Sequence, residues 1–173
     1  RYPLSYSIQY RYDVYCTMGQ LKTLEFMDSN WFMHKDGSVK KYDSVDKFPV
    51  KCVGFVYRIT NTENGHDYIG RKFFWTIKKR PPLKGKKNKR RSTVETDWKT
   101  YYGSQKEILH LVKEGDSFDF KREILKYVTD KKQLTYFECK YLFINEVLET
   151  RNSYINDNIL GKFYRKDFLD EIK

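Results

Sequence analysis

The chain reads GFVYRITNTENGHDYIGRK over residues 54–72, and this stretch decides the fold. Its first half is rich in β-branched and aromatic residues, which favour strands. Asn64-Gly65 predicts a tight turn, because both residues tolerate positive φ. The pattern therefore predicts a β-hairpin that brings Tyr57 close to Tyr68. The hairpin ends at Gly70, where a backbone without a side chain can approach a ligand closely.

The length of 173 residues suits one compact domain plus an extension. No apolar run approaches the roughly 20 residues of a membrane span, and no secretory signal is visible, so we expect a cytoplasmic protein. Cys16, Cys52 and Cys139 lie far apart without a C-x-x-C pair, which argues against zinc. We expect them to be small buried residues in a reducing compartment.

The net charge of +11 comes mainly from one segment, residues 78–91. That segment has no acidic residue and nine basic ones: Lys78, Lys79, Arg80, Lys84, Lys86, Lys87, Lys89, Arg90 and Arg91. Without these nine charges the rest of the chain carries only +2. Such a segment indicates a polyanionic partner, with nucleic acid as the first candidate, although a nuclear-import signal has the same composition.

Local structure in this basic segment is expected to be irregular. Pro81-Pro82, Gly85 and mutual charge repulsion all oppose regular elements. The sequence therefore predicts a solvated, mobile loop, and such a loop can become ordered on a phosphate backbone.

Residues 1–50 are predicted to form a small β-rich extension. Alternating residues over 6–16 are typical of a half-buried strand, and 31–34 with 38–42 flank a hairpin turn. Two interpretations are open: extra strands beside the main sheet, which we favour slightly, or a surface for recognition of a substrate or partner.

Two helices and a third strand are expected after the basic segment. Ser104 with Glu107 forms a capping box, which predicts the start of a helix. Residues 120–128 suit a strand. Asp130 then predicts the start of a second helix that runs from Lys131 to about Glu149.

Glu138 lies at the margin of the apolar stripe of that second helix, about 40° from Leu134 at 100° per residue. A carboxylate in this place loses hydration and needs compensation. A salt bridge to a basic neighbour is the favoured explanation on helix geometry alone. A metal-binding or catalytic role is the sharper alternative.

Together these motifs resemble the GIY-YIG nuclease superfamily. The first half reads G-F-V-Y in place of G-I-Y, with one extra residue, and Tyr68-Ile69-Gly70 matches the second half. The basic insert, the stretch WKTYYGS over 98–104 and a glutamate on a later helix are similar to phage-encoded, homing-endonuclease-like members. The resemblance implies an α+β fold in which helices flank a small antiparallel three-stranded sheet. The nuclease domain would span 51–173, with the basic insert at 78–91.

The resemblance also implies functional residues. Tyr57 and Tyr68 match the two family tyrosines, and Glu138 matches the metal-binding glutamate. Asn156 matches the late asparagine, with Asn158 as a rival. Lys78 stands where the family has an arginine on its first helix. The candidates to replace that arginine are Arg71, Lys72, and, by folding back, Arg80 or Arg91.

The implied activity is metal-dependent hydrolysis of DNA by an activated water. Glu138 would hold one Mg²⁺ or Mn²⁺ per active site. Tyr57 would be the general base, which requires nearby cations because the tyrosine pKa is about 10. Tyr68 would orient water or phosphate, and Arg71 or Lys72 would contact the scissile phosphate.

The expected partner is double-stranded DNA, bound by the nine basic residues of 78–91 and by Lys99. A phage-encoded enzyme would act in the cytoplasm of its bacterial host. Two other classes stay open: a catalytically inactive nucleic-acid-binding module of the same fold, and a structural interaction protein that uses the aromatic-rich extension. The oligomeric state is not visible in the sequence.

Overall fold

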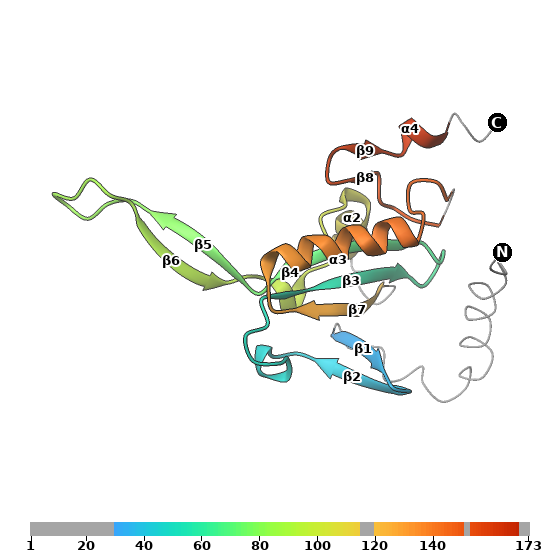
Figure 1. Cartoon of the computed structure of the whole chain (residues 1–173), viewed down its shortest axis with the longest axis horizontal. Coiled ribbons are helices and arrows are strands. Elements are labelled where there is room, and N and C mark those ends of the chain that lie inside the picture. Colours follow the sequence, from blue (N-terminus) through green and yellow to red (C-terminus); the bar gives the residue numbers. More distant parts are fainter. Residues whose placement is uncertain (1–29, 115–119, 151–152, 170–173) are drawn as a thin grey trace.

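A five-stranded mixed sheet forms the centre of the molecule in the computed structural model, which describes residues 30–114, 120–150 and 153–169 (Figure 1). The strand order is β2-β1-β7-β3-β4. The strands are β1 (Trp31–Lys35), β2 (Ser38–Tyr42), β3 (Gly54–Asn61), β4 (Asp67–Phe73) and β7 (Phe120–Val128). The α+β class is confirmed. The strand predicted over residues 6–16 lies outside the described residues.

The sheet is wider than the sequence predicted. Its centre, β4-β3-β7, is the expected set of three antiparallel strands. The hairpin β1-β2 adds two more, and β1 runs parallel to β7. An uncovered β7 would expose a row of unpaired backbone groups, and β1 pairs with them instead. For residues 31–42 the favoured interpretation, extra strands beside the main sheet, is therefore confirmed.

The β3-β4 hairpin shows why glycine stands at position 70. Tyr57 pairs with Gly70 across the two strands. A Cβ atom on Gly70 would lie 2.5 Å from the hydroxyl oxygen of Tyr57. Glycine at this position therefore makes room for the tyrosine, and the close approach of a ligand to its backbone stays a prediction. The predicted turn is present, with Gly65 at φ 73°.

Strand alternation divides the core into two layers. Phe55 and Tyr57 of β3 face an aromatic cluster that includes Trp31 and Trp98. Val56 faces the opposite side, where helix α3 (Lys131–Ile144) covers the sheet. Because β4 is the edge strand, side chains from both of its faces can contribute to the candidate site.

Helix α3 begins where the sequence predicted. Asp130 Oδ1 accepts hydrogen bonds from the backbone N–H groups of Lys132 and Gln133. The helix ends at Ile144, earlier than the predicted Glu149, and Glu146 follows with a positive φ of 50°. The boundaries of β7 agree with the prediction.

Helix α2 (Lys106–Glu114) begins two residues after the predicted cap, Ser104. The Ser104 hydroxyl instead forms a hydrogen bond of 3.1 Å with the Tyr68 hydroxyl. The remaining short elements are η2 (Val45–Lys47), η3 (Trp98–Thr100), β8 (Asn158–Ile159), β9 (Phe163–Tyr164) and α4 (Lys166–Leu169). Among the described residues, no helix is long and apolar enough to cross a membrane.

The predicted irregular loop of the basic segment is present over residues 81–89, but it connects two strands of a β-ribbon that the sequence did not predict, and these strands include residues 78–80 and 90–91. Strands β5 (Trp75–Arg80) and β6 (Arg90–Glu95) pair antiparallel and extend away from the sheet (Figure 1). β-Branched residues such as Thr76, Ile77 and Val94 form the paired part and favour extended backbone. The prolines lie only in the connecting turn, where they remove no ladder hydrogen bond.

Arg122 of β7 is a buried cation that supports the loop before α2. Its side chain is 1% exposed, and its guanidinium lies between the rings of Trp31 and Tyr102. It donates hydrogen bonds to the carbonyl oxygens of Lys99 and Tyr101, at 2.9 and 3.1 Å. Burial lowers the pKa of Arg122 to about 10.

Arg122→Ala is expected to lower the free energy of unfolding by about 3 kcal/mol or more, because two carbonyls lose their donor and two rings lose a packing partner. Urea denaturation of the variant measures this loss. Lys140→Ala, at an exposed position of α3, is the control and should stay within about 0.5 kcal/mol of wild type. Equal stability of the two variants would contradict the structural role of Arg122.

Candidate active site

A pocket of about 420 Å³ opens at the edge of β4, between α3 and the chain near residues 156–161. Several of the residues predicted from the sequence line it together. The lining includes Tyr68, Arg71, Ser104, Glu138, Asn156 and Asp157.

Arg71 and Glu138 form an ion pair in this pocket. Arg71 lies on the α3 side of β4, and its Nη1 atom is 2.7 Å from Oε2 of Glu138. The side chains are 31% and 16% exposed. Burial raises the pKa of Glu138, and the Arg71 charge opposes that shift. The predicted salt bridge of Glu138 is therefore present, and both of its residues line the pocket. The metal-binding or catalytic role of Glu138 stays a prediction.

The donor atoms of the pocket suit a hard divalent cation. Carboxylates of Glu138 and Asp157 and the amide of Asn158 line it. Mg²⁺ prefers such oxygen ligands and binds through one or two carboxylates while keeping several waters. Within the described residues, no group of three or more His, Cys, Asp or Glu side chains could hold a metal on its own. A single ion completed by water and phosphate oxygens fits this arrangement.

Tyr68 places a hydroxyl at the pocket. It lies on the face of β4 opposite Arg71, but β4 is the edge strand, so both side chains reach the same opening. Its hydroxyl meets that of Ser104 at 3.1 Å. Tyr68 is thus the accessible member of the tyrosine pair.

Tyr57 lies behind Tyr68, in the aromatic core. It is 1% exposed, and its hydroxyl forms a side-chain hydrogen bond with Tyr101. Burial raises the Tyr57 pKa well above 10, and the neighbouring Tyr68 and Tyr101 raise it further. A general base requires the opposite shift. The structure therefore does not favour Tyr57 as the base, and that role stays a prediction.

Lys72 points away from the pocket. Its Nζ atom is 2.6 Å from Asp97 Oδ1 and 3.4 Å from the centre of the Tyr101 ring. This hydrogen bond lowers the pKa of Asp97. Of the two adjacent cations predicted to replace the family arginine, Arg71 is the one that the fold brings to Glu138.

Asn156 is a buried backbone partner of β4. Its Oδ1 accepts from Ile69 N–H at 2.9 Å, and its Nδ2 donates to Ile69 O at 2.8 Å. The amide is 6% exposed and both of its ends are occupied. Asn156 can therefore position the strand between Tyr68 and Arg71, whereas direct contact with substrate is not supported. The rival Asn158 is exposed and accepts from Gly161 N–H at 2.9 Å.

One family model matches the chain over residues 31–159, with the description "Putative endonuclease segE, GIY-YIG domain". The chain belongs to the segE-type GIY-YIG endonuclease family. This confirms the family predicted from the two tyrosine motifs. The match begins at β1, so the segE-type domain includes strands that the sequence analysis had assigned to the extension. Neither the curated proteins nor the solved structures give a match.

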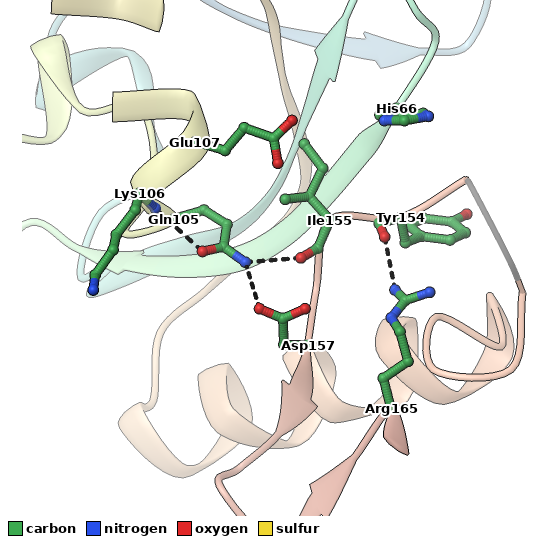
Figure 2. Close-up of a pocket in the computed structure, with 8 residues that line it drawn as sticks. All are labelled: His66, Gln105, Lys106, Glu107, Tyr154, Ile155, Asp157 and Arg165. Carbon is green, nitrogen blue, oxygen red and sulfur yellow. Dashed lines mark hydrogen bonds between the residues drawn. The ribbon is translucent and has the colours of Figure 1, made fainter. Parts of the chain in front are cut away.

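A second pocket of about 460 Å³ shares lining residues with the first. Figure 2 shows the side chains that line this second pocket. Gln105 and Asp157 line both pockets. Gln105 donates hydrogen bonds to Ile155 O and to Asp157 Oδ2, at 2.8 and 3.0 Å. The sequence analysis missed both residues, because they are 52 positions apart and neither belongs to a recognisable motif. The only sequence signal for Asp157 was its position directly after the predicted site residue Asn156.

The remaining cations predicted for DNA binding lie on or beside the ribbon. All nine basic residues of 78–91 are exposed, in β5, β6 and the turn between them. Arg80 pairs with Arg90, and Lys79 with Arg91, so the structure does not bring Arg80 or Arg91 back to the pocket. Lys99 lies at the ribbon base, 3.5 Å from a Glu95 carboxylate oxygen.

Proposed function

We propose that this chain is a divalent-metal-dependent endonuclease that hydrolyses phosphodiester bonds of duplex DNA. The observation that carries the proposal is the Arg71–Glu138 pair, 2.7 Å apart at the mouth of a pocket. Membership of an endonuclease family supports DNA as the substrate. Nicking of plasmid DNA in Mg²⁺ is the direct test.

Each pocket residue has a distinct proposed task. Glu138 would hold one Mg²⁺ or Mn²⁺, which supplies charge neutralisation at the phosphate and lowers the pKa of water. Arg71 would turn from Glu138 to a non-bridging phosphate oxygen, because a guanidinium binds phosphate through paired N–H groups. Tyr68 would orient the attacking water through its accessible hydroxyl. Asn156 would keep β4 in register beneath them.

The two tyrosines are expected to differ in effect. Tyr68→Phe removes the hydroxyl that reaches the pocket and should slow single-turnover cleavage by roughly 10- to 100-fold, the scale of a misplaced reacting group. Tyr57→Phe should slow it less, because the Tyr57 hydroxyl is buried. A loss of about 10²- to 10⁴-fold in Tyr57→Phe, with near-normal Tyr68→Phe, would restore Tyr57 as the general base.

The basic ribbon is expected to bind phosphates away from the chemistry. If six of its cations contact duplex DNA, log K should fall with log salt at a slope of about −5. Affinity should also depend weakly on sequence, since phosphate contacts carry little base information.

The test variant replaces six residues with serine: Lys84, Lys86, Lys87, Lys89, Arg90 and Arg91. It should flatten the slope, while the cleavage rate at saturating DNA changes less. A rate collapse at saturation with intact affinity would instead place the catalytic cation in the ribbon.

A catalytically inactive DNA-binding module is the second candidate. Two observations favour it: Tyr57 is buried with a raised pKa, and Arg71 is already occupied by Glu138. Such a module would retain the salt dependence of the ribbon but would show no metal-dependent cleavage.

A further inference from the structure

The β5-β6 ribbon has the form of an arm. All six residues of β5 are exposed, so this strand packs on neither side against the domain. Hydrogen bonds from Thr96 to the carbonyl oxygens of Phe73 and Phe74 anchor its base. Each strand spans roughly 17 Å, at about 3.3 Å per residue. An isolated two-stranded ribbon is marginally stable in water, which indicates that this arm acts against a partner.

The tip of the arm combines cations with an apolar point. Residues 81–89 read PPLKGKKNK, so every side chain there is basic, amide or apolar. Leu83 is 56% exposed. A β-turn holds it in place: Lys86 N–H donates to Leu83 O at 2.8 Å, and Gly85 takes a φ of 79°. A large apolar side chain is therefore presented at the far end, surrounded by positive charge.

We propose that this ribbon enters the minor groove of duplex DNA and that Leu83 wedges between two base pairs, so that the protein bends the DNA it binds. The composition of the tip matches this mode, since minor-groove binders use Lys, Arg and Asn along the groove and insert Leu or Pro at a base step. A narrow minor groove also concentrates negative potential, which attracts the lysines. The inference rests on the proposed DNA substrate, but not on catalysis.

The position of the arm links the bend to the active site. β4 ends at Phe73, and β5 begins at Trp75, so the arm continues the strand that carries Arg71. The base of the arm therefore lies close to Arg71 along the chain, and duplex held along the arm would extend toward the pocket. A kink opens base steps and exposes the backbone, which would present a phosphate to Arg71.

Fluorescence energy transfer across a short duplex tests the bend. The full chain is mixed with a duplex of about 20 base pairs, roughly 68 Å long, that carries dyes at its two ends. EDTA keeps the DNA intact. A central kink of about 60° shortens the end-to-end distance by about one seventh, so energy transfer should rise on binding.

Leu83→Ala removes the wedge and leaves every charge. It should lose most of the rise in energy transfer and keep the salt slope of wild type. Leu83→Met retains an apolar wedge and should bend DNA normally. Val50→Ala, at an apolar side chain 87% exposed outside the arm, is the matched control and should also bend it.

Three results would overturn the inference: no change in energy transfer with bound wild-type protein, an unchanged rise in Leu83→Ala, or equal affinity for duplex RNA of the same sequence. A minor-groove-binding drug should compete, whereas methylation of guanine in the major groove should not. Glu138→Gln should bend DNA like wild type. If the wild-type protein bends DNA but never cleaves it in Mg²⁺ or Mn²⁺, the proposed nuclease activity is contradicted and the bending inference holds. If it cleaves DNA without bending it, the bending inference is contradicted and the proposed nuclease activity holds.

Discussion

Glu138→Gln is expected to reduce the single-turnover rate of DNA cleavage by about 10³-fold, or about 4 kcal/mol. Glutamine keeps the size of the side chain but lacks the negative charge that holds the metal. The loss should persist at saturating Mg²⁺ or Mn²⁺, while DNA affinity measured in EDTA stays within a few-fold of wild type. The measurement is the rate of conversion of a labelled duplex at excess enzyme.

The chain offers a closely matched control for this variant. Glu123 forms an ion pair with Arg58 at 2.6 Å, and its side chain is 14% exposed, compared with 16% for Glu138. Glu123 lies outside the pocket. Glu123→Gln therefore breaks an equivalent pair without touching the site and should cleave at nearly the wild-type rate. Equal losses in both variants would show that stability, not metal binding, explains the effect.

Arg71→Gln is the second large effect, with an expected loss of about 10²- to 10³-fold in the cleavage rate. A preorganised donor aimed at developing negative charge contributes on this scale. Arg71→Lys should recover only part of the rate, because lysine lacks the planar fork that binds two oxygens. The loss should appear in the rate at saturation, since one of many cations is removed from the binding surface.

Arg58→Gln and Lys72→Gln separate the alternatives for Arg71. Arg58 matches Arg71 in exposure, 33% against 31%, and in its glutamate partner, yet it is outside the pocket. Lys72 is adjacent in sequence but is held by Asp97 on the other face. Both variants should retain most of the activity. A larger loss of cleavage rate in Lys72→Gln than in Arg71→Gln would mean that Lys72, and not Arg71 of the Arg71–Glu138 ion pair, is the cation that acts in cleavage.

Local sequence signals predicted much of the fold. The boundaries of β7 and the start of α3 followed from alternation and from the Asp130 cap, which act over a few residues. Ser104 failed as a cap because Tyr68, 36 positions away, takes its hydroxyl. The paired strands of the basic ribbon were missed because its charges and prolines outweighed the β-branched residues that pair these strands. Tertiary context decided the case of Ser104, whereas the ribbon forms by pairing between its own two strands.

The candidate site shows the same limit. Tyr68 and Glu138 were found from motif and helix position. The choice of Arg71 over Lys72 needed the sheet, because adjacent residues of a strand point to opposite faces and only one face meets α3. The burial of Tyr57 and the backbone role of Asn156 depend on contacts between distant segments. Neither could be inferred from the pattern of residues alone.

A plasmid-nicking time course with the wild-type chain tests the central claim most directly. Supercoiled DNA is incubated with Mg²⁺, with Mn²⁺ or with EDTA, and the nicked and linear forms are quantified beside Glu138→Gln. The account predicts that nicked or linear DNA accumulates with either metal and that neither form accumulates in EDTA or with the variant. Binding to the plasmid without cleavage in either metal, or equal cleavage by Glu138→Gln, would contradict it.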